Sequence, residues 1–124
     1  MAKPEEKIDF DYYIAEIVEK LKELNPYKII LFGSCAWGTP NEYSDIDLLV
    51  VLNKNEIPKN YRERMNYKLF VRNKIIDLSF QVPIDLIVYT KPMYKKFNEL
   101  GSLFSKEILT KGKILYEAKN ERMA

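Results

Sequence analysis

The sequence of 124 residues contains no histidine and a single cysteine, Cys35. Without histidine, the chain has no imidazole base to activate a serine or cysteine nucleophile. The usual zinc sites built from cysteine and histidine are excluded for the same reason. A lone cysteine cannot form a disulfide within the chain. We therefore expect any acid–base chemistry to rest on carboxylates, lysines, tyrosines or metal-bound water.

Long apolar runs and a strong charge imbalance are also absent. No apolar run approaches the roughly 20 residues that span a bilayer, and the start of the chain, MAKPEEKIDFDYY, lacks the apolar centre of a signal peptide. A cytoplasmic location without a membrane partner is therefore predicted. The net charge of +2 is too small to argue for nucleic acid as a partner by itself.

The length and composition predict one globular domain. The residues are 47% hydrophobic and 31% charged, which is typical of a folded chain. A chain of this length is large enough for a single core and small for two. We expect a single domain over residues 1–124, with a folded core at about 9–116 and flexible ends.

The most informative stretch is residues 28–51, KIILFGSCAWGTPNEYSDIDLLVV. The apolar residues 28–32 predict a strand that ends at Gly33-Ser34, a pair suited to a sharp turn and to the start of a helix. Residues 45–51 predict a second, buried strand that opens with two aspartates. Because side chains alternate across a strand, Asp45 and Asp47 are expected to project from one face and Ile46 from the other.

Residue chemistry in this stretch is compatible with metal and phosphate binding. Neighbouring carboxylates repel each other, and a hard divalent cation such as Mg²⁺ can compensate them while leaving positions for water and phosphate. A helix that begins at Ser34 would present N–H groups to a phosphate, and Gly33 would allow a close backbone approach. Each feature alone is common at turns, so it is their combined order that indicates a metal–nucleotide site.

The remaining elements follow from hydrophobic periodicity. Apolar residues spaced three or four apart predict a helix over 9–24, whose apolar stripe is interpreted as core packing in preference to a partner-binding face. Further helices are expected at 59–72, 93–100 and 102–110, a strand at 83–89 with Pro83 at its start and a short edge strand at 114–116, whereas 73–81 is ambiguous. The expected buried positions of the second and last helices are Tyr61, Met65, Leu69, Phe70, Leu103, Phe104, Ile108 and Leu109.

Basic residues dominate the exposed side of the helix expected at 59–72. We interpret this side as a solvated helix face in preference to a surface for triphosphate, RNA or an acidic protein. Its basic residues are Lys59, Arg62, Arg64, Lys68 and Arg72, with Lys74 directly after them.

The sequence resembles the signature of the nucleotidyltransferase superfamily that includes DNA polymerase beta, a GS pair followed by a D-x-D. The matching residues are Gly33-Ser34, Gly38 and Ser44-Asp45-Ile46-Asp47-Leu48. The likeness is greatest to the minimal nucleotidyltransferases, small prokaryotic proteins often encoded beside HEPN-domain proteins as toxin–antitoxin pairs. That family expects a third carboxylate on a later strand, and Asp85 in VPIDLIVY matches it. The resemblance covers about residues 28–90. It implies an α/β (α+β) fold of the polymerase beta type, a small mixed β-sheet with helices packed on it.

The resemblance also implies roles for individual residues. Asp45, Asp47 and Asp85 would be catalytic and would hold two Mg²⁺ ions, while Gly33 and Ser34 would bind the triphosphate of ATP. The implied activity is Mg-dependent transfer of a nucleoside monophosphate, AMP from ATP, onto a hydroxyl. A tyrosine of a HEPN-type partner protein would be the acceptor, with this chain as the antitoxin.

The sequence leaves several alternative functions open. They are a catalytically weak antitoxin that masks its partner, an enzyme for a small-molecule acceptor and, least favoured, a nucleic-acid-binding accessory protein. Asp85 has the alternative of a structural ion pair with Lys or Arg. Many family members carry Arg where this chain has Trp37, which we interpret as a packed aromatic in preference to a base-stacking platform. Cys35 is interpreted as a small buried filler; Asn41 and Tyr43 flank the loop without a decided role.

Overall fold

The computed structural model describes residues 8–38 and 40–118. Its centre is a mixed four-stranded sheet of β1 (Lys28–Phe32), β2 (Ile46–Val51), β3 (Ile84–Tyr89) and β4 (Lys113–Glu117), in the order β3-β2-β1-β4. β1 pairs antiparallel with both β2 and β4, whereas β2 and β3 are parallel. The small mixed sheet that the sequence predicts is thus confirmed.

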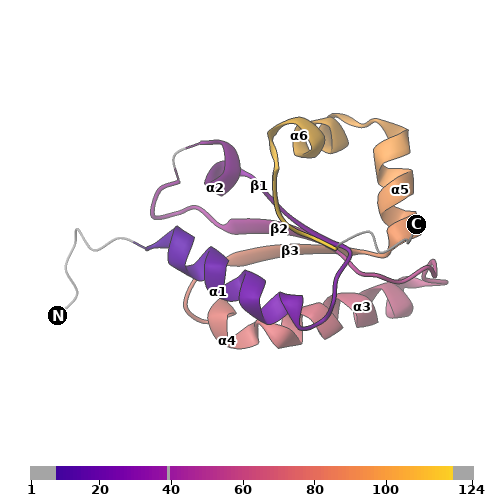
Figure 1. Cartoon of the computed structure of the whole chain (residues 1–124), viewed down its shortest axis with the longest axis horizontal. Coiled ribbons are helices and arrows are strands. Elements are labelled where there is room, and N and C mark those ends of the chain that lie inside the picture. The colour runs from indigo at the N-terminus through magenta and orange to yellow at the C-terminus, as the bar shows by residue number, and fades with distance from the viewer. Residues whose placement is uncertain (1–7, 39, 119–124) are drawn as a thin grey trace.

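Helices cover both faces of this sheet (Figure 1). Their bounds are α1 (Phe10–Lys22), α2 (Ser34–Trp37), α3 (Tyr61–Lys74), α4 (Ile76–Ser79), α5 (Lys91–Leu100) and α6 (Leu103–Lys111). In Figure 1, α1, α3 and α4 lie on one side of the sheet and α5 and α6 on the other, with α2 beyond the end of β1. The ambiguous stretch 73–81 contains the end of α3 and the whole of α4.

Two apolar layers hold the helices on the sheet. On the α1/α3 side, Ile17 and Leu21 of α1 are fully buried and pack in one cluster with β1, β2 and β3. Strand residues whose side chains point to the other face of the sheet form the second cluster, together with Tyr94 of α5 and Ile108 of α6. Because β2 is buried from both sides, its sequence is a continuous apolar run after Asp47. The buried strand members of the first cluster are Ile29, Leu31, Ile46, Leu48, Val50, Leu86 and Val88, and those of the second are Ile30, Phe32, Leu49 and Val51.

The expected buried face of α3 is wrong. Tyr61, Leu69 and Phe70 are 72%, 42% and 50% exposed, whereas Val71 is fully buried. The helix packs on the first cluster through Val71 and, one turn earlier, the partly buried Tyr67. Its apolar residues do not form one stripe, so contact with the sheet selects the face that periodicity did not identify.

The expected buried face of α6 is right only at Ile108, which is buried as predicted. Leu103, Phe104 and Leu109 are 84%, 40% and 53% exposed, while Ser105 is buried in their place. Ser105 can lie in the interior because its hydroxyl donates to the Ser102 carbonyl oxygen at 3.0 Å, so burial leaves no unpaired donor. Ser105 is therefore buried at a position that the apolar pattern did not predict to be inward.

The chain ends agree with the sequence only in part. Glu117 belongs to β4 and the Ala118 N–H donates to the Tyr27 carbonyl oxygen at 3.0 Å, so these two residues are ordered, contrary to the predicted loose tail. The rest of the predicted flexible ends, residues 1–7 and 119–124, lies outside the described residues. Across the described ranges no helix combines the length and apolarity needed to cross a membrane. The single domain over residues 1–124 and the cytoplasmic location stay predictions.

Candidate active site

The turn after β1 has a backbone conformation that depends on glycine. Gly33 has φ 77° and ψ −164°, a region occupied almost solely by glycine. A Cβ atom at this position would also overlap Oδ2 of Asp47. The missing side chain of Gly33 therefore lets the Asp47 carboxylate lie against the backbone of the turn.

The predicted helix at Ser34 is present as a single turn, α2. The Ala36 and Trp37 N–H groups donate to the Gly33 carbonyl oxygen at 2.9 and 3.1 Å, and the Gly38 N–H donates to the Ser34 oxygen at 3.0 Å. The first N–H groups of a helix have no acceptor within it. The Gly33-Ser34 turn consequently has the geometry that the sequence predicts, and its role in phosphate binding remains a proposal.

The strand register brings Asp47 and Asp85 together. Asp47 on β2 is the register partner of Asp85 on parallel β3, and of Phe32 on β1. Asp45 directly precedes β2, and the Ile46 N–H after it donates to the Pro83 carbonyl oxygen at 2.9 Å, which fixes the start of both strands. Asp47 and Asp85 thus occupy adjacent strands at the same level, on the sheet face that carries α5 and α6.

The three aspartates influence one another electrostatically. Burial, followed by the negative charges of Asp85 and Asp45, raises the pKa of Asp47 from 3.8 to about 6. Burial, with the charges of Asp47, Asp11 and Asp45, also raises the pKa of the Cys35 thiol. None of the ion pairs among the described residues includes the three aspartates, so the alternative of a structural ion pair for Asp85 is not seen there.

The donor set fits a hard divalent cation by its chemistry. It offers carboxylate oxygens only, and the raised pKa of Asp47 shows that its negative charge lacks compensation. In the described part of the chain, no three Cys, Asp or Glu side chains converge closely enough as placed to hold a metal ion. Metal binding would therefore have to draw the carboxylates together by rotation of their side chains.

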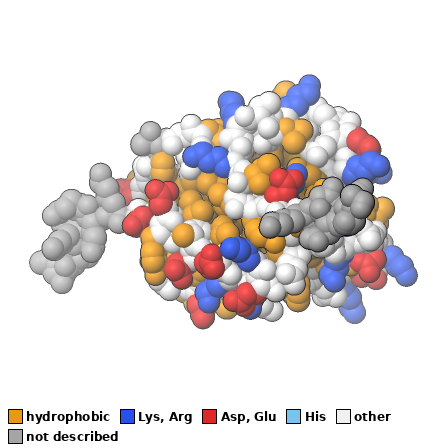
Figure 2. Space-filling model, viewed as in Figure 1, with side chains coloured by type: hydrophobic (Ala, Val, Ile, Leu, Met, Phe, Trp, Pro, Cys, Tyr) orange, Lys and Arg blue, Asp and Glu red, His pale blue; other side chains and the backbone are white. Residues whose placement is uncertain are grey.

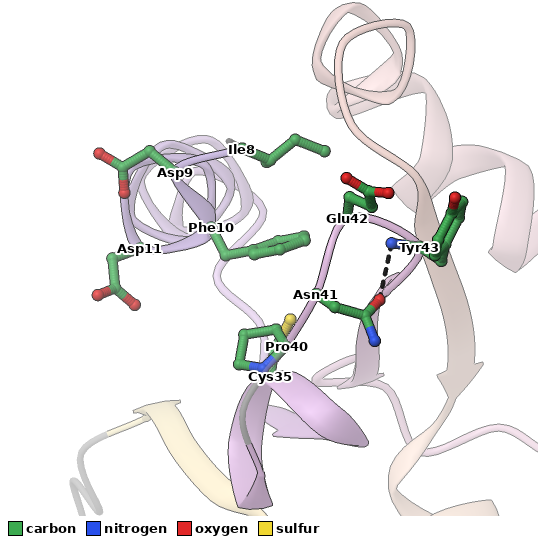
Figure 3. A pocket seen from close by; sticks show the side chains of 9 residues that line it. All are labelled: Ile8, Asp9, Phe10, Asp11, Cys35, Pro40, Asn41, Glu42 and Tyr43. Carbon is green, nitrogen blue, oxygen red and sulfur yellow. Dashed lines mark hydrogen bonds between the residues drawn. The ribbon is translucent and has the colours of Figure 1, made fainter. Parts of the chain in front are cut away.

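A cavity of about 630 Å³ lies between the start of α1, α2 and the loop at 40–43 (Figure 3). In Figure 3, Ile8 and Phe10 extend from α1 towards this loop, whereas Asp9 and Asp11 point away from it. The half-buried Cys35 belongs to its wall, and the Cys35 thiol donates to the Asp45 carbonyl oxygen at 3.5 Å. The cavity therefore adjoins the loop that leads to the aspartates.

The lining of this cavity does not suit a triphosphate. Its residues include Asp9, Asp11 and Glu42 and neither Lys nor Arg among those described. Figure 2 shows acidic side chains gathered over the start of α1, at the left of the face in view. Asn41 and Tyr43, which the sequence left undecided, line the cavity wall, where the Tyr43 N–H donates to Asn41 Oδ1 at 2.8 Å.

Lys111 lies next to the site through its contact with Trp37, and nothing in the sequence predicts this. Trp37 is 41% exposed, so its interpretation as a packed aromatic is wrong. Lys111, at the end of α6, has its Nζ atom 5.3 Å from the centroid of the Trp37 ring. Only the tertiary structure brings these two distant residues together.

Comparison with known proteins agrees with this geometry. Residues 14–116 match the family described as nucleotidyltransferase domain. Two candidate protein adenylyltransferases of Methanocaldococcus jannaschii are similar in sequence: one is 36% identical over 93 residues, or 74% of this chain and 59% of the relative. The other is 33% identical over 89 residues, or 72% of this chain and 77% of the relative. The chain thus spans about three fifths of the first relative.

Two solved structures share the fold. A candidate nucleotidyltransferase from Sulfolobus solfataricus superposes with a TM-score of 0.55 at 20% identity, covering 94% of this chain and 93% of that one. A toxin–antitoxin structure with AMP-PNP gives a TM-score of 0.53 at 21% identity, covering 85% of this chain and 73% of the matched one. The mixed sheet with its helices is therefore an arrangement found in nucleotidyltransferases.

Proposed function

Because this chain belongs to the family of nucleotidyltransferase domains, we propose that it transfers AMP from ATP to a hydroxyl group. Asp45, Asp47 and Asp85 are the proposed catalytic carboxylates. The observation that carries the proposal is the placement of Asp47 opposite Asp85 in parallel strands, against the Gly33 turn, with a pKa raised to about 6. This is a concentration of negative charge beside a backbone turn suited to phosphate.

Mg²⁺ is the proposed metal at this site. Asp45 and Asp47 would hold two ions, and Asp85 would complete the coordination of one of them. Bound there, the ions would neutralise charge on the phosphates and lower the pKa of the acceptor hydroxyl. The oxygen-only donor set supports this choice of metal.

The chain's own residues would orient the two substrates. Backbone N–H groups at Gly33-Ser34 and the Ser34 hydroxyl would hold the phosphates. The acceptor oxygen would form a bond to the α-phosphorus while the bond from that phosphorus to the bridging oxygen breaks, and the electron pair leaves with pyrophosphate. Asp85, which is exposed at the edge strand, would take the acceptor proton.

The proposed acceptor is a hydroxyl of a partner protein. Two relatives are named as candidate protein adenylyltransferases, and one structure of the same fold is a toxin–antitoxin. These names support a protein acceptor and a toxin–antitoxin context. A tyrosine of a HEPN-type toxin as the acceptor, with this chain as the antitoxin, is our proposal from the family resemblance of the sequence. Transfer to such a tyrosine would neutralise the toxin by covalent modification.

A masking antitoxin without transfer is the second candidate. The observation that favours it is an exposed apolar surface at α5 and α6, where Leu100, Leu103 and Leu109 are 73%, 84% and 53% exposed. Such a surface would bind a partner independently of the aspartates. It predicts equal neutralisation of the partner with and without the carboxylates.

Transfer of label from α-³²P-ATP into a lysate of the source organism, with Mg²⁺, tests the proposal. The wild type is compared with the Asp45→Asn, Asp47→Asn double variant and with Asp77→Asn, which removes a carboxylate on α4. A labelled protein band with the wild type and the control, but not with the double variant, is expected. Full labelling by the double variant would refute the assignment. Capture of a specific partner without any label would make masking the leading function.

A further inference from the structure

Lys111 lies over an aromatic ring beside the candidate site. Its Nζ atom is 5.3 Å from the centroid of Trp37, a cation–π arrangement between the last residues of α6 and α2. Both side chains are open to solvent. Lys111 takes part in none of the ion pairs found among the described residues. Its ammonium is therefore held near the site by a contact that a phosphate can replace.

The backbone fixes both residues close to the Gly33-Ser34 turn. On one side, the Trp37 N–H donates to the Gly33 carbonyl oxygen at 3.1 Å. On the other, Gly112 follows α6 and is packed so closely that an added Cβ would lie 3.2 Å from the Leu31 carbonyl oxygen. Lys113 then pairs with Leu31 as β4 begins. The backbone at Lys111 thus lies beside the last residues of β1, directly before the Gly33-Ser34 turn.

A triphosphate at this turn would need cationic partners. The Asp47 carboxylate lies against the turn, with Asp85 as its register partner, and a triphosphate would add further negative charge. The described lining of the cavity at α1 provides neither Lys nor Arg. A flexible ammonium beside the turn can form a charge-assisted hydrogen bond to phosphate, which is stronger than an exposed cation–π contact.

We propose that Lys111 binds the β- and γ-phosphates of the nucleoside triphosphate, and that Trp37 is the platform that holds its ammonium beside the turn before nucleotide arrives. The inference rests on the proposed function, since it concerns the same nucleotide. In the bound state Lys111 leaves the ring and contacts phosphate. The pair would then distinguish a triphosphate from a monophosphate.

The chain carries its own reporter for this exchange. Trp37 is its single tryptophan, so a change in fluorescence emission reports a change in the surroundings of this ring, and comparison with Lys111→Gln assigns that change to the ammonium. ATP and AMP are titrated in the presence of Mg²⁺ into the wild type and into Lys111→Gln, Lys111→Arg and Lys106→Gln. Lys106 is the matched control, an exposed lysine of the same helix. Calorimetry measures each affinity independently of the fluorescence.

We expect Lys111→Gln to weaken ATP binding about tenfold, as loss of one charge-assisted contact predicts. Affinity for AMP should stay within about twofold, because AMP lacks the phosphates that Lys111 contacts. Lys111→Arg should retain ATP affinity and Lys106→Gln should match the wild type. ATP should change the Trp37 emission in the wild type, and much less in Lys111→Gln.

Each contrary outcome has a separate meaning. Wild-type binding of ATP with unchanged affinity in Lys111→Gln would overturn the role of Lys111 and leave the proposed function standing. Equal weakening of ATP and AMP would overturn the assignment to the terminal phosphates. A wild type that binds no ATP by calorimetry would refute the proposed function, and this inference with it.

Discussion

Replacement of Asp47 by Asn should stabilise the metal-free protein at neutral pH. The folded state raises the pKa of this carboxyl from 3.8 to about 6. Between these values the folded state holds a proton that the unfolded state has lost, so the free energy of unfolding falls as pH rises. Above pH 6 the loss is complete. The Asn side chain has similar shape and no charge, so it avoids this cost.

The size of the effect follows from the shift. About two pKa units correspond to about 3 kcal/mol without screening. Because the Asp47 side chain is half-buried and partly screened by water, we expect a gain of about 1–2 kcal/mol in the free energy of unfolding at pH 7.5. The same comparison at pH below 4 should show no gain, since the carboxyl is then protonated in both states.

Urea denaturation in EDTA, from pH 3 to 8, measures this difference. The wild type is compared with Asp47→Asn and with Asp77→Asn, the control used for transfer. Addition of Mg²⁺ should stabilise the wild type and not Asp47→Asn, because the ion removes the cost of the charge. If Asp47→Asn were less stable than the wild type in EDTA at pH 7.5, the account of an uncompensated charge cluster would be refuted.

Three further predictions concern the packing that positions the site, each measured by urea denaturation. Gly33→Ala should cost about 1–3 kcal/mol, because its φ of 77° is strained for alanine, and unchanged stability would contradict the described turn. Gly112→Ala should cost about 1–3 kcal/mol, because its Cβ would lie 2.5 Å from the Ile108 carbonyl oxygen. Gly38→Ala, whose nearest contact is at 3.8 Å, is its control and should change stability by less than about 0.5 kcal/mol, so equal losses would argue against that contact. Leu48→Ala should cost about 2–5 kcal/mol because Leu48 is fully buried, whereas Leu103→Ala at 84% exposure should be nearly neutral, and the reverse order would contradict the described core.

Local patterns predict the centre of this fold well. The strand predicted at 28–32 coincides with β1, whereas β2 and β3 each begin one residue later than predicted, at Ile46 and Ile84. Alternation correctly places Asp47 away from Ile46, because side-chain direction in a strand depends on parity alone. The glycine at 33 is likewise understood from the sharp turn that follows a buried strand.

Features that depend on tertiary contact could not be predicted this way. Asp85 and Asp47 are register partners on strands that α3 and α4 separate in the sequence. The prediction that these two residues lie close together therefore rests on the family resemblance and not on their spacing. The exposed side of α3 and the burial of Ser105 depend on which face meets the sheet. The approach of Lys111 to Trp37 depends on the packing of Gly112 against β1.

The aspartate cluster is proposed to support transfer of a nucleoside monophosphate. Parallel labelling with α-³²P-ATP and γ-³²P-ATP tests it most directly, because nucleotidyl transfer leaves the α-phosphate on the acceptor and releases the γ-phosphate with pyrophosphate. We expect an acceptor labelled from the α position only, and no label with the Asp85→Asn variant. Label from the γ position, or undiminished α label with Asp85→Asn, would contradict it.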